Sequence, residues 1–404
     1  MSEPLDESPI EPRIEAAVEP MEPVVEAPAA EPAADPLLQR GEEMELGFGP
    51  QRPAIQGLLR LKLRVDGERI VDCRPVAGYL HRGLEKLFEL QPFAENVLLA
   101  DRLDFMAAAA AQLAYVGAVE KLVGIAAPPR ARFLRTIFAE LERIASHLYG
   151  LATHVSDVGA MPPFFAALRA RDEVLDLYAL YFEAYAPALD GLLPGGLHHD
   201  LPAGWVERCR GLAERLPHRL DEIEGLLTEN RLWKKRTVGI GVLPPEVAID
   251  AGVTGPALRG SGVAWDLRKA LPYEAYGEVE LDVPVGRNGD AYDRYLVRMA
   301  EMRQANRIVV QCLDRLPDGP VLAERLADLV AARDTEAYHA VEGPKGELGF
   351  YIVGDGTANP YRCHLRAPSF AHLQALTELC RGELVADLVT LIGTLDIALG
   401  EADR

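Results

Sequence analysis

Three short segments of the chain gather polar residues where glycine or proline interrupts the apolar pattern. Gly49–Gly57 reads G-P-Q-R-P-A-I-Q-G, which predicts a rigid loop directly before a strand. Tyr79–Lys86 reads Y-L-H-R-G-L-E-K and crowds His81 and Arg82, with two further charged residues, into the first turns of a predicted helix. Asp157–Phe165 reads D-V-G-A-M-P-P-F-F and sets one acid beside aromatic residues. Taken singly, each segment is typical of capping or packing.

Standard enzyme signatures are missing from the sequence. It contains no G-x-G-x-x-G turn, Walker loop, H-E-x-x-H helix or G-x-S-x-G elbow. The three segments together instead predict an apolar pocket with a few placed polar groups, suited to an aromatic ligand.

Charge and hydropathy exclude several functional classes. The 404 residues include 42 Lys and Arg against 62 Asp and Glu, a formal charge of −20, which excludes a generic nucleic-acid binder. No apolar stretch reaches the roughly 18–20 residues of a bilayer-spanning helix. The N-terminus lacks the basic-then-apolar layout of a signal peptide. We therefore expect a soluble chain, able to sit on a membrane-embedded partner.

The cysteines are scattered and form no C-x-x-C pair: Cys73, Cys209, Cys312, Cys363 and Cys380. This spacing argues against a disulfide framework and against a self-contained zinc or iron–sulfur site. We expect reduced thiols and no metal ligated by this chain.

Residues 1–45 differ in composition from the rest of the chain. They hold thirteen acidic residues, two arginines and eight prolines, too polar a mixture to bury a core. We expect a disordered acidic, proline-rich tail. Its alternative role, an acidic docking arm for a basic partner, stays open.

Residues 46–404 are expected to form one domain of α+β class. Alternation around Asp66–Gly67 predicts an N-terminal β-hairpin at 57–75. Apolar residues at helical spacing predict a central bundle over 80–335, with small antiparallel sheets at its periphery. The expected helices are 103–125, 131–153, 168–186, 203–228 (interrupted by Pro217), 289–316 and 321–333. We also expect a strand at Glu278–Val283, and a C-terminal hairpin (348–366) with helices within 347–404.

Longer motifs make the sequence recognisable. In order along the chain stand G-P-Q-x-P, G-Y-L-H-R-G-x-E-K, A-Y-x-x-A-V-E-K-L, D-x-G-A-x-x-P-F-F, R-G-S-G-x-A-W-D-L-R-K, P-K-G-E-L-G-F-Y and L-D-I-x-x-G-E-x-D-R. From Leu46 to Arg404 the chain closely resembles the D-type subunits of respiratory NADH:quinone oxidoreductase (complex I). That family is related to the nickel–iron hydrogenase large subunit, so the resemblance implies a hydrogenase-large-subunit-like fold.

The resemblance implies a place in a membrane-associated, proton-translocating NADH:quinone oxidoreductase. Such a subunit belongs to the peripheral arm on the cytoplasmic side of the bacterial inner membrane, among other peripheral-arm subunits and against the membrane quinone-site subunit. A small partner subunit holds a 4Fe–4S cluster, and quinone is reduced in the crevice between them. The isolated chain should be inactive. Leu395–Gly400 reads L-D-I-A-L-G where a hydrogenase has paired cysteines, so direct hydrogen chemistry is not expected.

The family's motifs also imply roles for individual residues. Arg82 would lie next to the partner's cluster, where a fixed positive charge favours the reduced state, and His81 would lie beside it. Asp157 would sit behind the quinone headgroup. The headgroup loop, Gly49–Gly57, would reach towards the headgroup through Gln56. The other expected site residues are Phe105, opposite the headgroup, and Met161 and Phe164, which would line the quinone-binding pocket.

Three positions depart from the family pattern. Gln56 stands where the family has histidine, and Phe105 where it has tyrosine. Glutamine donates a hydrogen bond but is no acid near neutral pH, and phenylalanine does neither. Ala188–Leu193 lacks the histidines and arginine usual near the cluster.

Three readings of these departures stay open. The fold and assembly surface are kept while the quinone chemistry is altered, with protons taken from water or Asp157. Alternatively, this is a working paralogue with ordinary substitutions. The remaining alternative is a scaffold, or a module of a ferredoxin- or hydrogenase-related membrane complex.

Overall fold

The computed structural model describes residues 43–182, 191–323 and 329–404. The α+β class is confirmed, since long helices dominate and the sheets are small and antiparallel. The predicted tail lies outside the described residues except for its last three. Of these, Met44 and Glu45 are not tail, because they begin strand β1 (Met44–Phe48) and pair with Val65 and Arg64.

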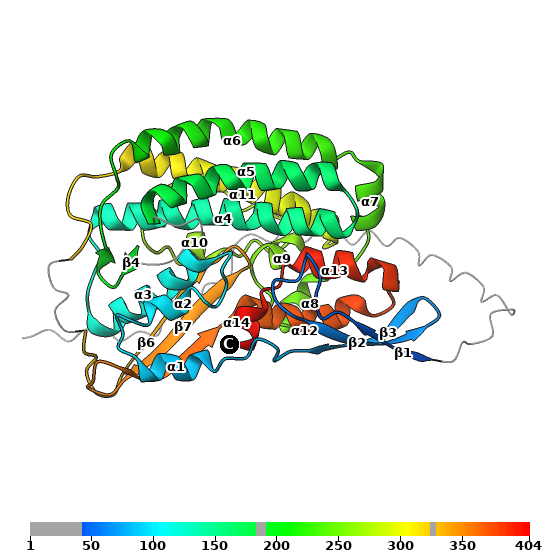
Figure 1. Ribbon diagram of the computed structural model, residues 1–404, viewed down its shortest axis with the longest axis horizontal. Helices are drawn as coiled ribbons and strands as arrows, with labels where there is room; N and C mark the ends of the chain where they lie inside the picture. Colours follow the sequence, from blue (N-terminus) through cyan, green and yellow to red (C-terminus); the bar gives the residue numbers. More distant parts are fainter. Residues whose placement is uncertain (1–42, 183–190, 324–328) are drawn as a thin grey trace, which may run out of the picture. The chain divides into compact units, whose positions relative to one another are not determined.

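Five long helices form the bundle, with α4 at its centre (Figure 1): α3 (Ala108–Val123), α4 (Pro129–Asp157), α5 (Met161–Phe182), α6 (Trp205–Leu227) and α11 (Ala291–Arg315). Helix α4 packs against both α5 and α11. Twenty-three of its 29 residues are buried, acids and arginines included. Because a buried charge is costly unless it is paired, the polar side chains of α4 must find partners inside the protein.

Helix α6 is not interrupted at Pro217, contrary to the sequence expectation. Proline has no N–H, so the carbonyl of Ala213, four residues earlier, loses its helical partner. The side-chain amide of Asn306 on α11 donates to that carbonyl oxygen over 2.9 Å. A side chain from another helix thus stabilises a proline inside α6.

Two three-stranded antiparallel sheets lie beside the bundle. In the first, β1 adds to the pair β2 (Arg60–Asp66) and β3 (Arg69–Val76), and buried residues of this sheet pack on α12 (Pro368–Cys380). The second joins β6 (Thr335–Glu342), β7 (Glu347–Gly354) and β8 (Pro360–Arg366), with α3 against β6 and β7. Strand β6 was not predicted: its first residue falls at the end of the expected bundle (80–335), and the remainder precedes the expected hairpin at 348–366.

Three other sequence expectations were wrong. The helix expected to hold His81 and Arg82 in its first turns begins only at α1 (Leu84–Leu90), after Gly83 with φ of 64°. Residues 279–283 form no strand, because the amides of Glu280 and Asp282 bond to glutamine side chains of α11 instead. Residues 321–323 and 329–333 are not helical, and the part of that expected helix between them lies outside the described residues.

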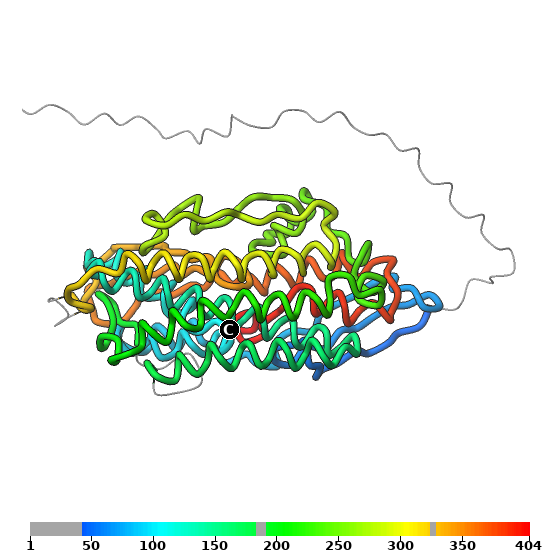
Figure 2. The backbone as a smooth tube through the Cα atoms, turned by 90° about the horizontal axis from the view of Figure 1, so that it is seen from above, coloured from blue at the N-terminus to red at the C-terminus, as the bar shows by residue number. Residues whose placement is uncertain are grey.

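The remaining elements are short. Residues 238–290 run alongside α11 as an outer layer (Figure 2). The short elements are α2 (Val97–Ala100), β4 (Leu192–Leu193), β5 (Gly196–Leu197), α7 (Arg231–Thr237), α8 (Pro245–Asp250), α9 (Gly255–Gly260), α10 (Leu267–Ala270), η1 (Tyr276–Glu278), η2 (Val385–Asp387), α13 (Leu388–Leu395) and α14 (Leu399–Asp403).

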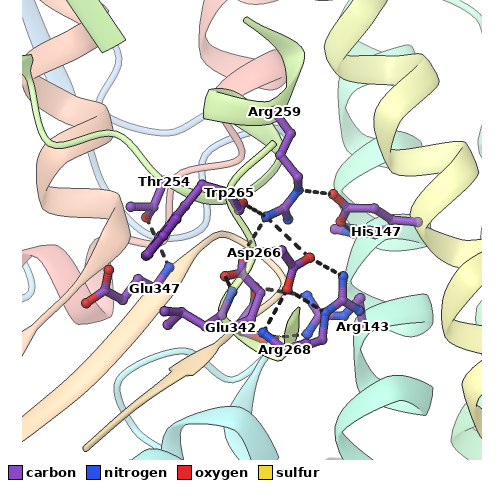
Figure 3. Close-up of polar contacts among 12 residues, drawn as sticks. Arg143, His147, Thr254, Arg259, Trp265, Asp266, Arg268, Glu342 and Glu347 are labelled. Carbon is purple, nitrogen blue, oxygen red and sulfur yellow. Dashed lines mark hydrogen bonds and ion pairs between the residues drawn. The ribbon is translucent and has the colours of Figure 1, made fainter. Parts of the chain in front are cut away.

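A buried ion network ties α4 to α9, α10, α11 and β6 (Figure 3). Arg259 pairs with Glu301 over 2.6 Å and with Glu342 over 2.7 Å. Burial raises the pKa of Glu301, but Arg259 and His147 outweigh it, and the pKa lies well below its usual range. Removing one member of such a buried pair costs about 3–5 kcal/mol, so the network fixes how these elements meet.

Candidate functional site

Residues Asp396–Asp403, next to the C-terminal Arg404, contact several of the predicted site segments. This C-terminal segment contacts the headgroup loop through Asp396, Ile397 and Leu399. It also contacts Arg82 through Gly400 and His81 through Asp403. Segments that are hundreds of residues apart in sequence are thereby brought together.

Backbone pairing fixes the headgroup loop to this C-terminal segment. The amide of Gln56 donates to Ile397 O over 3.4 Å, and the amide of Leu399 donates to Gln56 O over 2.9 Å. Gly57 follows with φ of 122°, and a Cβ there would lie 2.8 Å from Cβ of Leu399. Only glycine allows this conformation together with so close an approach.

The Gln56 side chain is turned into the protein. It is 5% exposed, and its Nε2 donates to Oδ1 of Asp396 over 2.7 Å. Asp396 ends α13 in the left-handed conformation, φ 54°, and packs on Gly150 of α4, where a Cβ would lie 2.8 Å from its Oδ2. Oε1 of Gln56 and Oδ2 of Asp396 are buried without a partner among the described residues.

Asp157, the last residue of α4, holds the same loop from the other side. Its Oδ2 accepts the amide of Ala54 over 3.2 Å. Burial raises its pKa above the ordinary value of 3.8, against the lowering effects of the Ala54 amide and the Arg52 charge. Two carboxylates thus clamp the loop, and the side chains of Gln56 and Asp157 do not bond to each other.

His81 and Arg82 lie at the far end of the C-terminal segment. Nδ1 of His81 lies 2.8 Å from the backbone oxygen of Asp403, whose carboxylate accepts the amides of Gly78 and Leu80. Arg82 is exposed and donates to the carbonyl of Arg102 over 2.7 Å. His81 also lines a pocket of about 750 Å³, whose other basic residues are Lys86, Arg362 and Arg404.

Phe105 precedes α3 and is 56% exposed. Its inner side lines a cavity of about 10 Å³, which it shares with Glu142 of α4 and with Arg171 and Tyr178 of α5. The C-terminal segment passes close by, since a Cβ on Gly400 would lie 2.5 Å from the carbonyl oxygen of Leu103.

Met161 and Phe164 stand on the first turn of α5, after the turn that follows Asp157. Met161 is exposed, and Phe164 contacts the exposed Phe165 edge to face at 5.1 Å. They present an apolar surface next to the acid that holds the headgroup loop.

Sequence reasoning missed the buried partners of the site. Asp396 stands in the terminal motif L-D-I-x-x-G-E-x-D-R, but nothing in the pattern shows that it bonds Gln56. Glu142 stands among apolar residues at helical spacing, and its proximity to Phe105 depends on tertiary contacts. The third departure is only partly visible, because residues 188–190 lie outside the described residues.

Within the described ranges, no group of three or more His, Cys, Asp or Glu side chains is placed to hold a metal ion. The five cysteines are buried and not bonded in disulfides. None of the described helices combines the length and apolarity needed to cross a membrane.

Comparison with known proteins gives consistent matches over nearly the whole chain. The family model for the respiratory-chain NADH dehydrogenase 49 kDa subunit matches residues 157–335 and 325–404. A D-type NADH-quinone oxidoreductase subunit of Thermodesulfovibrio yellowstonii is 44% identical over 390 residues, covering 89% of this chain and 96% of the relative. The D-type subunit of Geotalea uraniireducens is 45% identical over 387 residues (90% and 99%), and that of Magnetococcus marinus 46% over 383 (89% and 96%).

The fold is therefore of the hydrogenase-large-subunit-like α+β class. More narrowly, the chain belongs to the family of the 49 kDa, or D-type, subunit of respiratory-chain NADH dehydrogenase.

Proposed function

We propose that this chain forms one wall of the quinone-reduction chamber of a multi-subunit, proton-translocating NADH:quinone oxidoreductase. The other wall belongs to a small subunit that carries a 4Fe–4S cluster, and further peripheral-arm and membrane subunits complete the assembly. The observation that carries the proposal is the convergence of the headgroup loop, the His81–Arg82 segment and the Phe105 region on Asp396–Asp403.

The chemistry of the wall supports a hydrophobic redox substrate. Exposed Phe105 and Met161 offer apolar contact, and Asp157 supplies an acid whose pKa is raised by burial. Quinone becomes quinol by taking up two electrons and two protons. Electrons come from NADH by way of the partner's cluster, beside which the exposed Arg82 adds positive charge. Asp157 provides one proton on the side of the headgroup loop.

The exposed apolar surface of the chamber wall also fits a location at the periphery of the membrane. We place the chain on the cytoplasmic side of the bacterial inner membrane, held there by the subunit that completes the quinone site. A chamber formed between subunits explains why its wall is exposed when this chain is taken alone. It also predicts that the isolated chain oxidises no NADH.

A scaffold without quinone turnover is the second candidate, and one observation favours it. The side-chain amide of Gln56 donates its hydrogen bond to Asp396, and the side chain of Phe105 has no polar group. Neither position therefore offers the usual proton donor to the chamber. Electron-input subunits that copurify with the chain distinguish an NADH-driven assembly from a ferredoxin- or hydrogenase-related one.

Replacing Asp157 tests the proposal in the assembled complex. Asp157→Asn keeps the size of the side chain and a hydrogen-bond acceptor for Ala54, but it removes the acid. Loss of a general acid lowers kcat by roughly 10²-fold, so NADH-driven reduction of ubiquinone or menaquinone analogues should fall with little change in KM. A fully assembled wild-type complex that reduces no quinone would support the scaffold instead.

A further inference from the structure

We propose that Glu142 is the second proton donor of the quinone chamber, delivering its proton past Phe105 to the headgroup oxygen on that side. The inference rests on the proposed function, because it assumes that quinone is reduced beside Phe105. It assigns a role to a carboxyl group buried behind the chamber wall.

The need for a second donor follows from the substrate. A quinone has two oxygens, and each must gain a proton when the ring takes up two electrons. Asp157 lies on the side of the headgroup loop. On the Phe105 side the phenyl ring has no proton to give. A donor must therefore stand behind Phe105 or be water from outside.

Glu142 stands at that position. It is 1% exposed, and it lines the same small cavity as the inner face of Phe105. The cavity, about 10 Å³, has room for about one water molecule, which can pass a proton between the carboxyl group and the chamber. The amides of Ala109 and Ala110, at the start of α3, hold the carboxyl group in place over 2.7 and 2.8 Å.

Charged groups of both signs lie around Glu142, but none of them is its ion-pair partner among the described residues. Asp104 is buried near it, with Lys345 bonded to Asp104 over 2.6 Å, and Arg171 lines the same cavity as Glu142. Because the Lys345 ammonium pairs with Asp104 and the described residues contain no ion pair of Glu142, a medium of low dielectric favours the protonated form of Glu142. Burial and the charge of Asp104 raise the pKa of Glu142 to about 8, although the two amides and Lys345 lower it.

The remaining polar groups around the cavity do not replace Glu142 as donor. Arg171 faces the cavity from α5 and donates to Sδ of Met106 over 3.4 Å. Tyr178 bonds the carbonyl of Phe138, and burial raises its pKa well above the ordinary value, so it stays neutral. Of the groups that line the cavity, only Glu142 both holds a proton near neutral pH and can lose it there.

The proton balance is simple. The O–H bond of the Glu142 carboxylic acid breaks, and an O–H bond forms on the quinone oxygen as NADH-derived electrons arrive. The carboxylate then regains a proton from solvent. Turnover should accordingly fall as the pH rises through about 8, where Glu142 becomes ionised.

Glu142→Gln in the assembled complex tests the inference. We expect kcat for quinone reduction to fall roughly 10²-fold with little change in KM, and the inflection near pH 8 to disappear. Adding Phe105→Tyr to that variant places a hydroxyl donor at the chamber wall and should restore most of the activity. The control is Glu214→Gln, an exposed glutamate of α6 outside both the cavity and the ion network, which should leave kcat and the pH profile unchanged.

An infrared measurement gives a readout besides activity. A protonated carboxylic acid band that titrates near pH 8 should be present in the wild-type complex and absent from E142Q. Unchanged kcat and pH profile in E142Q, or no such band in the wild type, would overturn the inference. A complex that reduces no quinone but shows the band would contradict the proposed function and leave Glu142 as a proton-holding group.

Discussion

At the scale of residues, two positions of the candidate site, Gln56 and Phe105, carry no acidic group. Gln56 bonds the interior carboxylate Asp396, while Asp157 bonds the backbone of the same loop at Ala54. Both carboxylates hold the loop in place, but the Gln56 side chain is no acid near neutral pH. In our proposal the protons come from Asp157 and Glu142, and burial raises the pKa of both carboxyl groups.

Supplying proton donors at Gln56 and Phe105 should raise turnover. Gln56→His combined with Phe105→Tyr supplies an imidazole and a phenol at the two ends of the headgroup, and we expect kcat for quinone reduction to rise about tenfold or more. The measurement is NADH-driven quinone reduction by the assembled complex. Glu214→His, at an exposed position of α6, serves as control and should change nothing. No rise in the double variant would show that the altered residues do not limit the chemistry.

At the scale of elements, tertiary contacts decide which secondary structure forms where the sequence pattern alone does not. Apolar spacing correctly predicted the long helices, because their buried faces repeat along the sequence. The apolar pattern over 278–283 wrongly predicted a strand, and the proline in α6 wrongly predicted a break in the helix, for a common reason. In both places the deciding partners, such as Asn306 opposite Ala213, come from a helix distant in the chain. No local signal reports them.

The contact between α3 and β6 shows how tightly such packing is set. A Cβ on Gly117 would lie 2.1 Å from the ring of His339 on β6, whereas one on Gly225 of α6 would meet nothing within 4 Å. Gly225→Ala should therefore raise the free energy of unfolding by about 0.5–1 kcal/mol, since alanine favours helix. Gly117→Ala should lower it by about 1–3 kcal/mol through overpacking. Denaturant unfolding of the purified chain compares them, and equal effects would contradict the packing argument.

At the scale of the whole molecule, the candidate site is an assembly of distant segments on a rigid frame. The sequence motifs indicated which segments belong to the candidate site. That these segments meet at Asp396–Asp403 follows from tertiary contacts, which the spacing of residues along the sequence does not show. The buried ion network fixes α4, and α4 in turn carries both Glu142 and Asp157. Helix α4 thus fixes the positions of both proposed proton donors relative to the headgroup loop and to Phe105.

The central claim is that quinone is reduced against this wall, and photolabelling tests it most directly. The native complex is purified, illuminated with a photoreactive quinone and digested. We predict label in peptides that contain residues 49–57, 101–107 or 157–165 and in the 4Fe–4S partner, competed away by excess quinone. Label confined to other subunits, or to surfaces of this chain such as α6, would contradict the account.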